Sequence, residues 1–554
     1  MFSWRFSLKG GEHRNSYWGR GLKQALMVCA VLVAGRGEAA TSWQLAANQY
    51  ETAKIPLELA APRAGLTTAN RYYKAYPGLL YRVPVVVLGG AYPYQYTLTS
   101  APAGMTVGQQ YGDTDYGIIN WPNPTAGTSS VTVQVTDQAG AVAKVTYSVT
   151  VTTSGFIFVD SAKGHHSSAN GGTGTGTLAN PFLTMDDFYS GTVGGAASFS
   201  SRKSDNTYAG NFVYYRAGTY STGTMGTEGA DNGSRSPFIA GNKPKVHLAY
   251  PGETANIDVS NAAIIFYSDS AGNYYMGGLT FTGLGPNGDN KAWEWDSGVN
   301  DIGSFESTYV ASGVSSGGGS NASLMMSRNN GSYSNYVFMS HNTVSASNGY
   351  DLFLGYATNK FVAENNTLNN INGNGFYAKI NNANWSIRAN TGLQGNTGPL
   401  YDIDGYSTSN NIEIAWNNFK SAGDGANMGL TPTTAIGNVW QYRNTWQVGQ
   451  HYIANMTVQN LTVANDVMTF TGTSASTHGW YYEKVVATPS VTGKFTGEEC
   501  VVRGTGCVDA TGKLTGTART NYLGLRGFEV GTSSAATTSP PVAPSGFTVK
   551  PVTQ

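Results

Sequence analysis

Five versions of one phrase follow one another in this sequence: YVFMSHNTV (336–344), FVAENNTL (361–368), WSIRANTG (385–392), IEIAWNNF (412–419) and VWQYRNTW (439–446). They place five asparagines in register at spacings of 24, 24, 27 and 27 residues: Asn342, Asn366, Asn390, Asn417 and Asn444. A repeat of about 20 to 50 residues indicates stacked structural units. Each phrase alternates apolar and polar residues, which is the two-residue period of a β-strand and not the period of a helix.

The recurring asparagine has a physical explanation if the repeats stack as coils. Equivalent residues of neighbouring coils then lie about 4.8 Å apart, the spacing of paired strands. Side-chain amides at this separation hydrogen-bond from coil to coil and satisfy polar groups inside a turn. The sequence therefore predicts stacked coils of parallel strands with an asparagine ladder.

Earlier segments extend this pattern towards the N-terminus. The VD, GGTGTG and NPF-x-T phrases within residues 156–188 resemble the entry segment of secreted β-helix proteins. VYYRAGTY (213–220), VHLAYPGE (246–253) and YYMGGLTFTG (274–283) are expected to form the first coils. With the asparagine repeat, residues of about 156 to 530 resemble the right-handed parallel β-helix of the pectate-lyase-like polysaccharide lyase superfamily. The resemblance implies an all-β fold and a polysaccharide substrate.

Composition and the chain ends point to export. Only 12% of the 554 residues are charged, 71 are glycine, and the formal net charge is zero, so no global field would draw the chain to nucleic acid or to an anionic membrane. A basic stretch, the apolar run ALMVCAVLVA (25–34) and small residues at 39–40 predict a signal peptide over residues 1–40. No later stretch is apolar enough to span a bilayer, so we expect a secreted bacterial protein, extracellular or periplasmic, with no membrane contact after cleavage. The oligomeric state is left open.

Three further segments follow from the sequence. Residues 41–153 have short alternating strands and regular Gly, Pro and Asp turns, and the phrases PAGMTV (102–107) and VTVQVTDQAG (131–140) resemble Ig-like (cadherin-like) modules of bacterial secreted proteins. This β-sandwich either binds carbohydrate or acts as a spacer before a β-helix at 154–530.

Residues 531–554 are rich in Ser, Thr and Pro and are expected to form a flexible tail. Cys500 and Cys507 are predicted to form a disulfide across a hairpin-sized loop.

A charged cluster is expected on one face of the coils. Between the asparagine phrases lie YDLFLGY (350–356), GFYAKI (375–380), LYDIDGY (400–406) and ANMGLTP (426–432). Their alternation assigns residues such as Leu352, Leu354, Phe376 and Ile403 to the core. The opposite parity then points outward in two columns: Asp351, Tyr377, Asp402 and Asn427, and Phe353, Lys379, Asp404 and Gly429.

The cluster fits two chemistries, and the resemblance to lyase-type β-helices puts a polysaccharide lyase that cleaves uronate-containing glycan by β-elimination first. In a lyase, Lys379 removes the proton next to a uronate carboxylate, while Asp402 and Asp404 hold Ca²⁺ or position the sugar. In a hydrolase, Asp402 and Asp404 are about 6.5–7 Å apart along a strand, within the roughly 6.5–9.5 Å that separates the two carboxylates of inverting glycosidases. Asp351 is a third catalytic candidate. A cluster that only solvates the sheet, or that binds carbohydrate without catalysis, remains open.

The remaining candidates concern substrate contact. Tyr377, Phe353 and Asn427 flank the cluster. Trp293 and Trp295 either form a sugar-stacking lip or cover the edge of a coil. Arg388 is expected to pair with Glu364 on the neighbouring coil, and a substrate role for Arg388 is the alternative.

Overall fold

The computed structural model describes residues 51–66, 69–189, 208–221, 238–239, 245–259, 264–268, 272–284, 291–296, 298–312, 323–328, 332–347, 351–403, 409–428, 436–449, 453–454, 458–464, 466–471, 490–491, 501–502 and 505–506. The predicted signal peptide, the C-terminal tail, Cys500, Cys507 and Asp404 lie outside these ranges. Two short strands lie between the cysteine positions, β41 (Val501–Val502) and β42 (Thr505–Gly506), and they pair as an antiparallel hairpin. The disulfide itself stays a prediction.

The N-terminal part is a small antiparallel β-sandwich. Its longest hairpin joins β8 (Gly127–Thr136) to β9 (Val142–Val151), and alternate residues of β9 are buried, as expected for a strand with one face in the core. With these strands, β2 (Lys74–Ala75) and β5 (Gln95–Ser100) complete one sheet. A second sheet contains β3 (Tyr81–Pro84), β7 (Ile118–Trp121) and β6 (Thr106–Val107), and β1 (Glu58–Ala61) pairs with β4 (Val86–Leu88).

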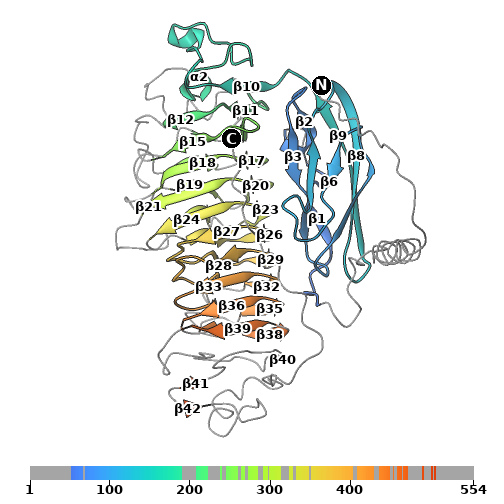
Figure 1. Cartoon of the computed structure of the whole chain (residues 1–554), viewed down its shortest axis with the longest axis vertical. Helices are drawn as coiled ribbons and strands as arrows, with labels where there is room; N and C mark the ends of the chain where they lie inside the picture. Colours follow the sequence, from blue (N-terminus) through green and yellow to red (C-terminus); the bar gives the residue numbers. More distant parts are fainter. Residues whose placement is uncertain are drawn as a thin grey trace, which may run out of the picture. The chain divides into compact units, whose positions relative to one another are not determined.

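The rest of the described chain forms a parallel β-solenoid with three sheets, visible in Figure 1 as a stack of coils. The first sheet contains, among the described residues, β10 (Phe156–Val159), β11 (Phe212–Tyr215), β14 (Val246–Ala249), β17 (Tyr274–Gly277), β20 (Ile302–Phe305), β23 (Ser334–Ser340), β26 (Thr358–Glu364), β29 (Ala383–Arg388), β32 (Asn410–Ala415), β35 (Ile436–Tyr442), β38 (Val458–Ala464) and β40 (Ser490–Val491).

From β11 to β35, each strand of the first sheet is followed by one strand of the second sheet and one of the third. The second contains β12 (Gly218–Ser221), β15 (Ala255–Asp258), β18 (Thr280–Leu284), β21 (Thr308–Ser312), β24 (Thr343–Ser347), β27 (Thr367–Asn369), β30 (Thr391–Gly392), β33 (Asn418–Ser421), β36 (Thr445–Val448) and β39 (Val467–Phe470). The third contains β13 (Phe238–Ile239), β16 (Ile264–Ser268), β19 (Lys291–Asp296), β22 (Ser323–Arg328), β25 (Asp351–Tyr356), β28 (Phe376–Ile380), β31 (Tyr401–Ile403), β34 (Ala426–Met428) and β37 (Ile453–Ala454). The predicted fold class, a parallel solenoid preceded by a small sandwich, is confirmed.

The asparagine ladder is present as predicted. The backbone N and Nδ2 of Asn342 donate to Oδ1 of Asn366 at 2.9 and 3.0 Å, and the same pair of bonds recurs down the ladder to Asn390, Asn417 and Asn444. The last step replaces asparagine by a carboxylate, because N and Nδ2 of Asn444 both donate to Oδ1 of Asp466. The ladder therefore satisfies one buried backbone N–H in each coil.

Each ladder asparagine follows a residue with positive φ. These residues are His341, Asn365, Ala389, Trp416 and Arg443, with φ between 51° and 59°. This conformation is uncommon for residues other than glycine. Its recurrence before each ladder asparagine marks the same sharp corner between the first and second sheets in successive coils.

Candidate functional site

The face predicted to carry the chemistry is the third sheet. In strands β28, β31 and β34 the predicted pairing is confirmed, because Tyr377 pairs with Asp402 and Asp402 with Asn427. The predicted outward position is wrong for Asp402, which is buried at 2% exposure. The side chain of Asn427 and the whole of Asp404 lie outside the described residues. The inward residues of these strands are also as predicted, since Phe376, Ala378, Tyr401 and Ile403 are buried in the solenoid core.

Lys379 occupies an irregular position in this sheet. Between β25 and β28 the register shifts, so that Gly355 pairs with Ala378 but Tyr356 pairs with Ile380, and Lys379 is the additional residue. Such bulges re-aim a side chain and are frequent beside active sites. The Lys379 Nζ lies 5.5 Å from the ring centroid of Tyr356 and 5.8 Å from that of Tyr377. All three residues are partly exposed.

Tyr356 is a site residue that the sequence analysis missed. It is the last residue of β25 and was not assigned to either column. Its place beside Lys379 depends on the bulge in β28, which shifts the pairing by one residue and has no mark in the sequence. One local feature of the sequence could have identified it: Tyr356 is an aromatic residue at the end of β25, the strand that pairs with the strand of Lys379.

Asp351 lies near this group but not in the predicted column. It is three residues before Leu354, and Leu354 is the residue of β25 that pairs with Tyr377. Oδ1 of Asp351 accepts hydrogen bonds from the backbone N and Nδ2 of Asn374, at 2.8 and 3.0 Å. Burial raises the pKa of the Asp351 carboxyl to about 7, against the lowering effects of these hydrogen bonds and of the Lys379 ammonium. This carboxyl group therefore exchanges its proton near neutral pH.

The calcium site expected at Asp402 and Asp404 stays a prediction. Asp402 is only 2% exposed, and Asp404, the other proposed ligand, lies outside the description. Ca²⁺ requires about six to eight oxygen ligands. Within the described ranges, no group of three or more His, Cys, Asp or Glu side chains is placed to hold a metal ion. No step of the chemistry below is assigned to a metal.

Three predicted substrate contacts are wrong because their side chains are inside the solenoid. Phe353, Trp293 and Trp295 are fully buried in the core, and Phe353 pairs with the inward residues Met325 and Phe376. In β25 the residues Leu352 to Leu354 are all buried, so alternation gave no outward direction for Phe353. The tryptophans neither form a lip nor cover an edge.

Arg388 is also buried, and its substrate role is wrong. The predicted ion pair with Glu364 is confirmed at 3.0 Å, and Glu413 of the next coil lies 3.5 Å away on the other side. Burial raises the pKa of Glu364, while Arg388 opposes that shift. The guanidinium also donates to three groups of the sandwich: the carbonyl oxygens of Val87 and Gly89 and the hydroxyl of Tyr94.

The sandwich is thus fastened to the coils and is not a freely tethered spacer. Strand β4 packs against β26 and β29 around Arg388. Ion pairs at other coils join Arg63 to Asp301 at 2.6 Å and Lys360 to Glu58 at 2.8 Å. These contacts cover the first sheet, whereas Lys379 lies on the third.

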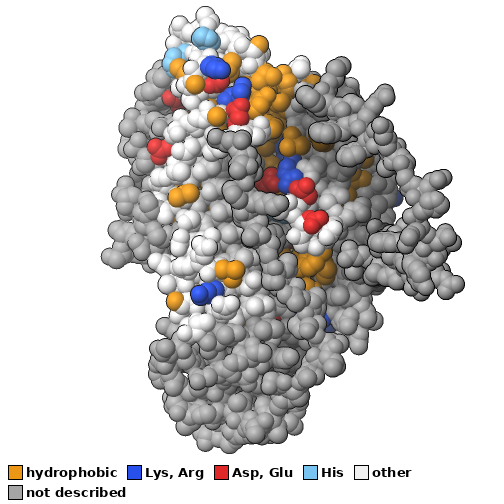
Figure 2. Space-filling view, in the orientation of Figure 1, with side chains coloured by type: hydrophobic (Ala, Val, Ile, Leu, Met, Phe, Trp, Pro, Cys, Tyr) orange, Lys and Arg blue, Asp and Glu red, His pale blue; other side chains and the backbone are white. Residues whose placement is uncertain are grey.

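The surface on the face shown in Figure 2 carries few charged side chains among its described residues. Most of the described area is white, which is backbone and uncharged polar side chains. This matches a chain with 12% charged residues. No helix in the described part of the chain has the length and apolar character needed to cross a membrane.

Comparison with known proteins identifies one segment by family and gives distant structural likenesses. Residues 64–152 match the family model "Putative Ig domain". No curated protein matches the chain in sequence.

Among solved structures, a rhamnogalacturonan lyase is 14% identical, with 58% of this chain and 75% of that chain covered and a TM-score of 0.31. Dex49A from Penicillium minioluteum is 10% identical, with 80% and 81% covered and a TM-score of 0.34. PfbA, a surface adhesin of Streptococcus pneumoniae, is 10% identical, with 51% and 85% covered and a TM-score of 0.28. Likenesses of this size assign no activity to the chain, and they include both enzymes and an adhesin.

Proposed function

We propose that this chain is an exported enzyme that cleaves an acidic polysaccharide, with the substrate lying across β25 and β28. The observation that supports this proposal is the position of Lys379 Nζ, 5.5 Å from the ring centroid of Tyr356 and 5.8 Å from that of Tyr377 on a partly exposed sheet. Tyrosine rings offer flat apolar faces together with a hydroxyl, which suits the surface of a sugar. An ammonium group forms a charge-assisted hydrogen bond with a uronate carboxylate.

The arrangement suits β-elimination better than the other chemistries considered. In this reaction a base takes the proton from the carbon next to the uronate carboxylate, and that electron pair forms a carbon–carbon double bond. The bond from the next carbon to the glycosidic oxygen breaks, and this oxygen receives a proton. The Lys379 ammonium, paired with the carboxylate, stabilises the negative charge that develops there.

Asp351 is the described group best suited to move the proton. Its pKa of about 7 matches neutral conditions, where a general base or acid is most effective. Both Asn374 hydrogen bonds go to Oδ1, which leaves Oδ2 to accept a proton. This changes the role expected for Lys379, which here pairs with the substrate carboxylate while Asp351 moves the proton.

Two alternatives remain as outcomes of the test. A hydrolase that uses Asp351 with Asp402 is disfavoured, because Asp402 is only 2% exposed. The pair of Asp402 and Asp404 is the other hydrolase candidate. A carbohydrate-binding protein without catalysis is the second candidate, because the hydrogen bonds of Asp351 to Asn374 also fit a purely structural corner.

The experiment is a product assay on a panel of uronate-containing polysaccharides, with calcium and with chelator. We expect ultraviolet absorbance from an unsaturated product, reduced about 100-fold or more in Lys379→Ala and in Asp351→Asn. Lys420→Ala, an exposed lysine of the second sheet, is the matched control and should retain activity. New reducing ends without absorbance, lost in Asp402→Asn, would assign the face to a hydrolase. Polysaccharide binding with neither product would leave a binding protein.

A further inference from the structure

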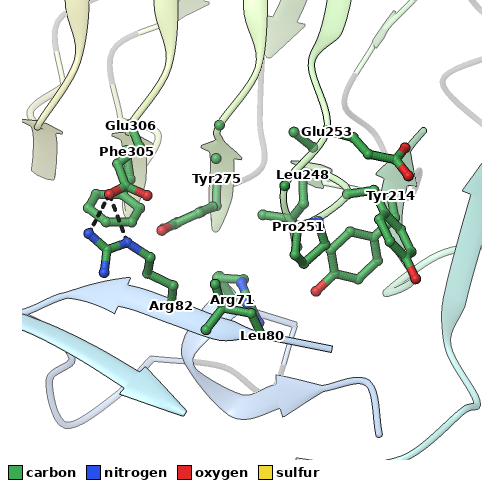
Figure 3. Close-up of a pocket in the computed structure, with 15 residues that line it drawn as sticks. Arg71, Leu80, Arg82, Tyr214, Leu248, Pro251, Glu253, Tyr275, Phe305 and Glu306 are labelled. Carbon is green, nitrogen blue, oxygen red and sulfur yellow. Dashed lines mark hydrogen bonds and ion pairs between the residues drawn. The ribbon is translucent and has the colours of Figure 1, made fainter. Parts of the chain in front are cut away.

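A recess lies between the sandwich and the first coils, on the first sheet and away from Lys379 (Figure 3). Its volume is about 180 Å³. The coils contribute aromatic walls from Tyr214, Tyr250 and Phe305. Two carboxylates and two guanidinium groups line it as well: Glu253, Glu306, Arg71 and Arg82. Pockets for drug-sized ligands measure about 300–1,000 Å³, so this recess suits a molecule the size of one sugar ring.

Three of the charged side chains that line the recess, Arg82, Glu306 and Glu253, are in ion pairs. Arg82 Nε donates to Glu306 Oε1 at 2.8 Å, and Arg216 binds Glu253 at 2.6 Å from outside the recess. Arg82 also contacts Asp115 at 2.8 Å. The lining residues Arg71 and Arg82 are balanced in number by Glu253 and Glu306, so the recess presents no net formal charge to a ligand. A neutral ligand with hydroxyl groups can still donate to carboxylate oxygens without disturbing the pairs.

Two buried polar atoms at the recess have no hydrogen-bond partner among the described residues. They are the hydroxyl of Tyr275 and Nε of Arg71, in side chains that are only 1% and 2% exposed. In Figure 3 Tyr275 extends from the coils towards Arg71 and Arg82 of the sandwich. Leaving such a group unsatisfied is unfavourable, so a bound partner in the recess would be favoured.

Glycines keep the recess open. A Cβ added at Gly277 would lie 2.9 Å from Leu248 Cδ2 and 3.0 Å from the Tyr275 ring, both of which line the recess. The adjacent Gly278 has φ +69°, a conformation that disfavours any side chain. A side chain at Gly277 would therefore displace Leu248 and Tyr275 or occupy part of the recess.

We propose that this recess binds one neutral sugar residue of a polysaccharide, as a subsite separate from the Lys379 face. The tyrosine and phenylalanine rings contact the apolar face of the sugar, and its hydroxyls bond to Glu306, Glu253 and the Tyr275 hydroxyl. The subsite does not require the Lys379 face to be catalytic. It gives the sandwich a binding role that it performs together with the coils.

The test is saturation-transfer NMR on the full-length protein with the neutral methyl glycosides of glucose, galactose, mannose and rhamnose, beside methyl glucuronide. We expect at least one neutral glycoside to bind. Tyr250→Ala and Tyr275→Phe should each weaken that binding by tenfold or more. Tyr275→Phe removes only one oxygen atom and therefore preserves the fold. Tyr333→Phe, at an exposed tyrosine outside the recess, is the control and should bind as the parent does.

Lys379→Ala separates this proposal from the proposed function, because it should leave glycoside binding unchanged. The proposal is overturned if no neutral glycoside binds, or if binding persists undiminished in both recess variants. In the first case water alone occupies the recess, and in the second the sugar binds elsewhere.

Discussion

At the scale of single residues, Asp351 combines two properties that normally exclude each other. It is a carboxyl group packed in a coil corner and bonded to Asn374, yet its residue is partly exposed at the face that carries Lys379. Burial outweighs both hydrogen bonds and the nearby ammonium, and the pKa rises to about 7 from the ordinary value of 3.8. A group placed in this way is a candidate acid or base, and its titration is also coupled to stability.

The first prediction concerns the pH dependence of unfolding. The folded carboxyl keeps its proton up to about pH 7, whereas the unfolded one releases it near its ordinary pKa of 3.8. Folding is therefore favoured by this group at low pH, and the contribution is lost as pH rises through 7. Relative to Asp351→Asn, which does not titrate, the free energy of unfolding should fall by up to about 4 kcal/mol between pH 4 and 8, at about 1.4 kcal/mol per pKa unit.

Chemical denaturation of both proteins at several pH values measures this difference. Solvent exposure of the carboxyl reduces its size but not its sign. A difference that stays constant with pH, or that grows as pH rises, would show that Asp351 is ionised in the folded protein at neutral pH. It would then be unsuited to the proton transfer proposed for it.

At the scale of elements, the solenoid has two ladders of different kinds. The inner ladder is buried, and each of its asparagines bonds to two coils. Asn390, for example, accepts from N and Nδ2 of Asn366 and donates to Asn417 Oδ1 and to the carbonyl of Ala363. A second ladder of side-chain amides is only part-buried and includes Asn335, Asn359, Asn384, Asn411 and Asn438.

The second prediction compares one member of each ladder. Asn390→Ala leaves the buried backbone N–H of Asn366 without an acceptor, and the expected cost is about 2–5 kcal/mol because at least two buried groups lose their partners. Asn359→Ala, in the part-buried ladder, removes two hydrogen bonds that water can replace, and the expected cost is about 1 kcal/mol or less. Equilibrium unfolding in denaturant gives both values. Equal losses in the free energy of unfolding would contradict the view that burial determines how much a ladder asparagine contributes to stability.

At the scale of the whole molecule, the described sandwich and solenoid share a buried ionic cluster. Arg388 is paired with Glu364 and Glu413 and is covered by carbonyl oxygens of the sandwich, including that of Gly89, 299 positions earlier in the chain. Removing one partner of a buried pair leaves the others charged and desolvated. Surface pairs such as Lys360 with Glu58 remain hydrated and contribute little.

The third prediction follows from this contrast. Calorimetry of the parent protein should show the sandwich and the coils that contact it unfolding in one transition. Arg388→Met should lower the stability by about 3–5 kcal/mol and separate the sandwich as an earlier transition. Lys360→Met, at a partly exposed pair across the same junction, is the matched control and should cost about 0–1 kcal/mol. Two transitions in the parent would show that the junction does not couple the two parts.

The sequence by itself determined the solenoid and its ladder. Strand alternation and a fixed repeat length are local properties, and once coils stack at the spacing of paired strands the asparagines must meet, as the bonds from Asn342 to Asn444 show. The same reasoning correctly placed Tyr377 beside Asp402, because both lie in coils of regular length.

The tertiary structure alone decided what lies beside Lys379 and Arg388. The bulge at Lys379 and the inward turn of Phe353 are shifts of one residue, and a shift of one residue exchanges the two faces of a strand without changing its composition. Trp293 and Trp295 lie in the core for a different reason. Aromatic residues suit both a core and a sugar-binding surface, so the residue type alone does not say which of the two they form. The surroundings of Arg388 come from a segment about 300 positions away, and a contact between such distant segments leaves no periodic trace in the sequence.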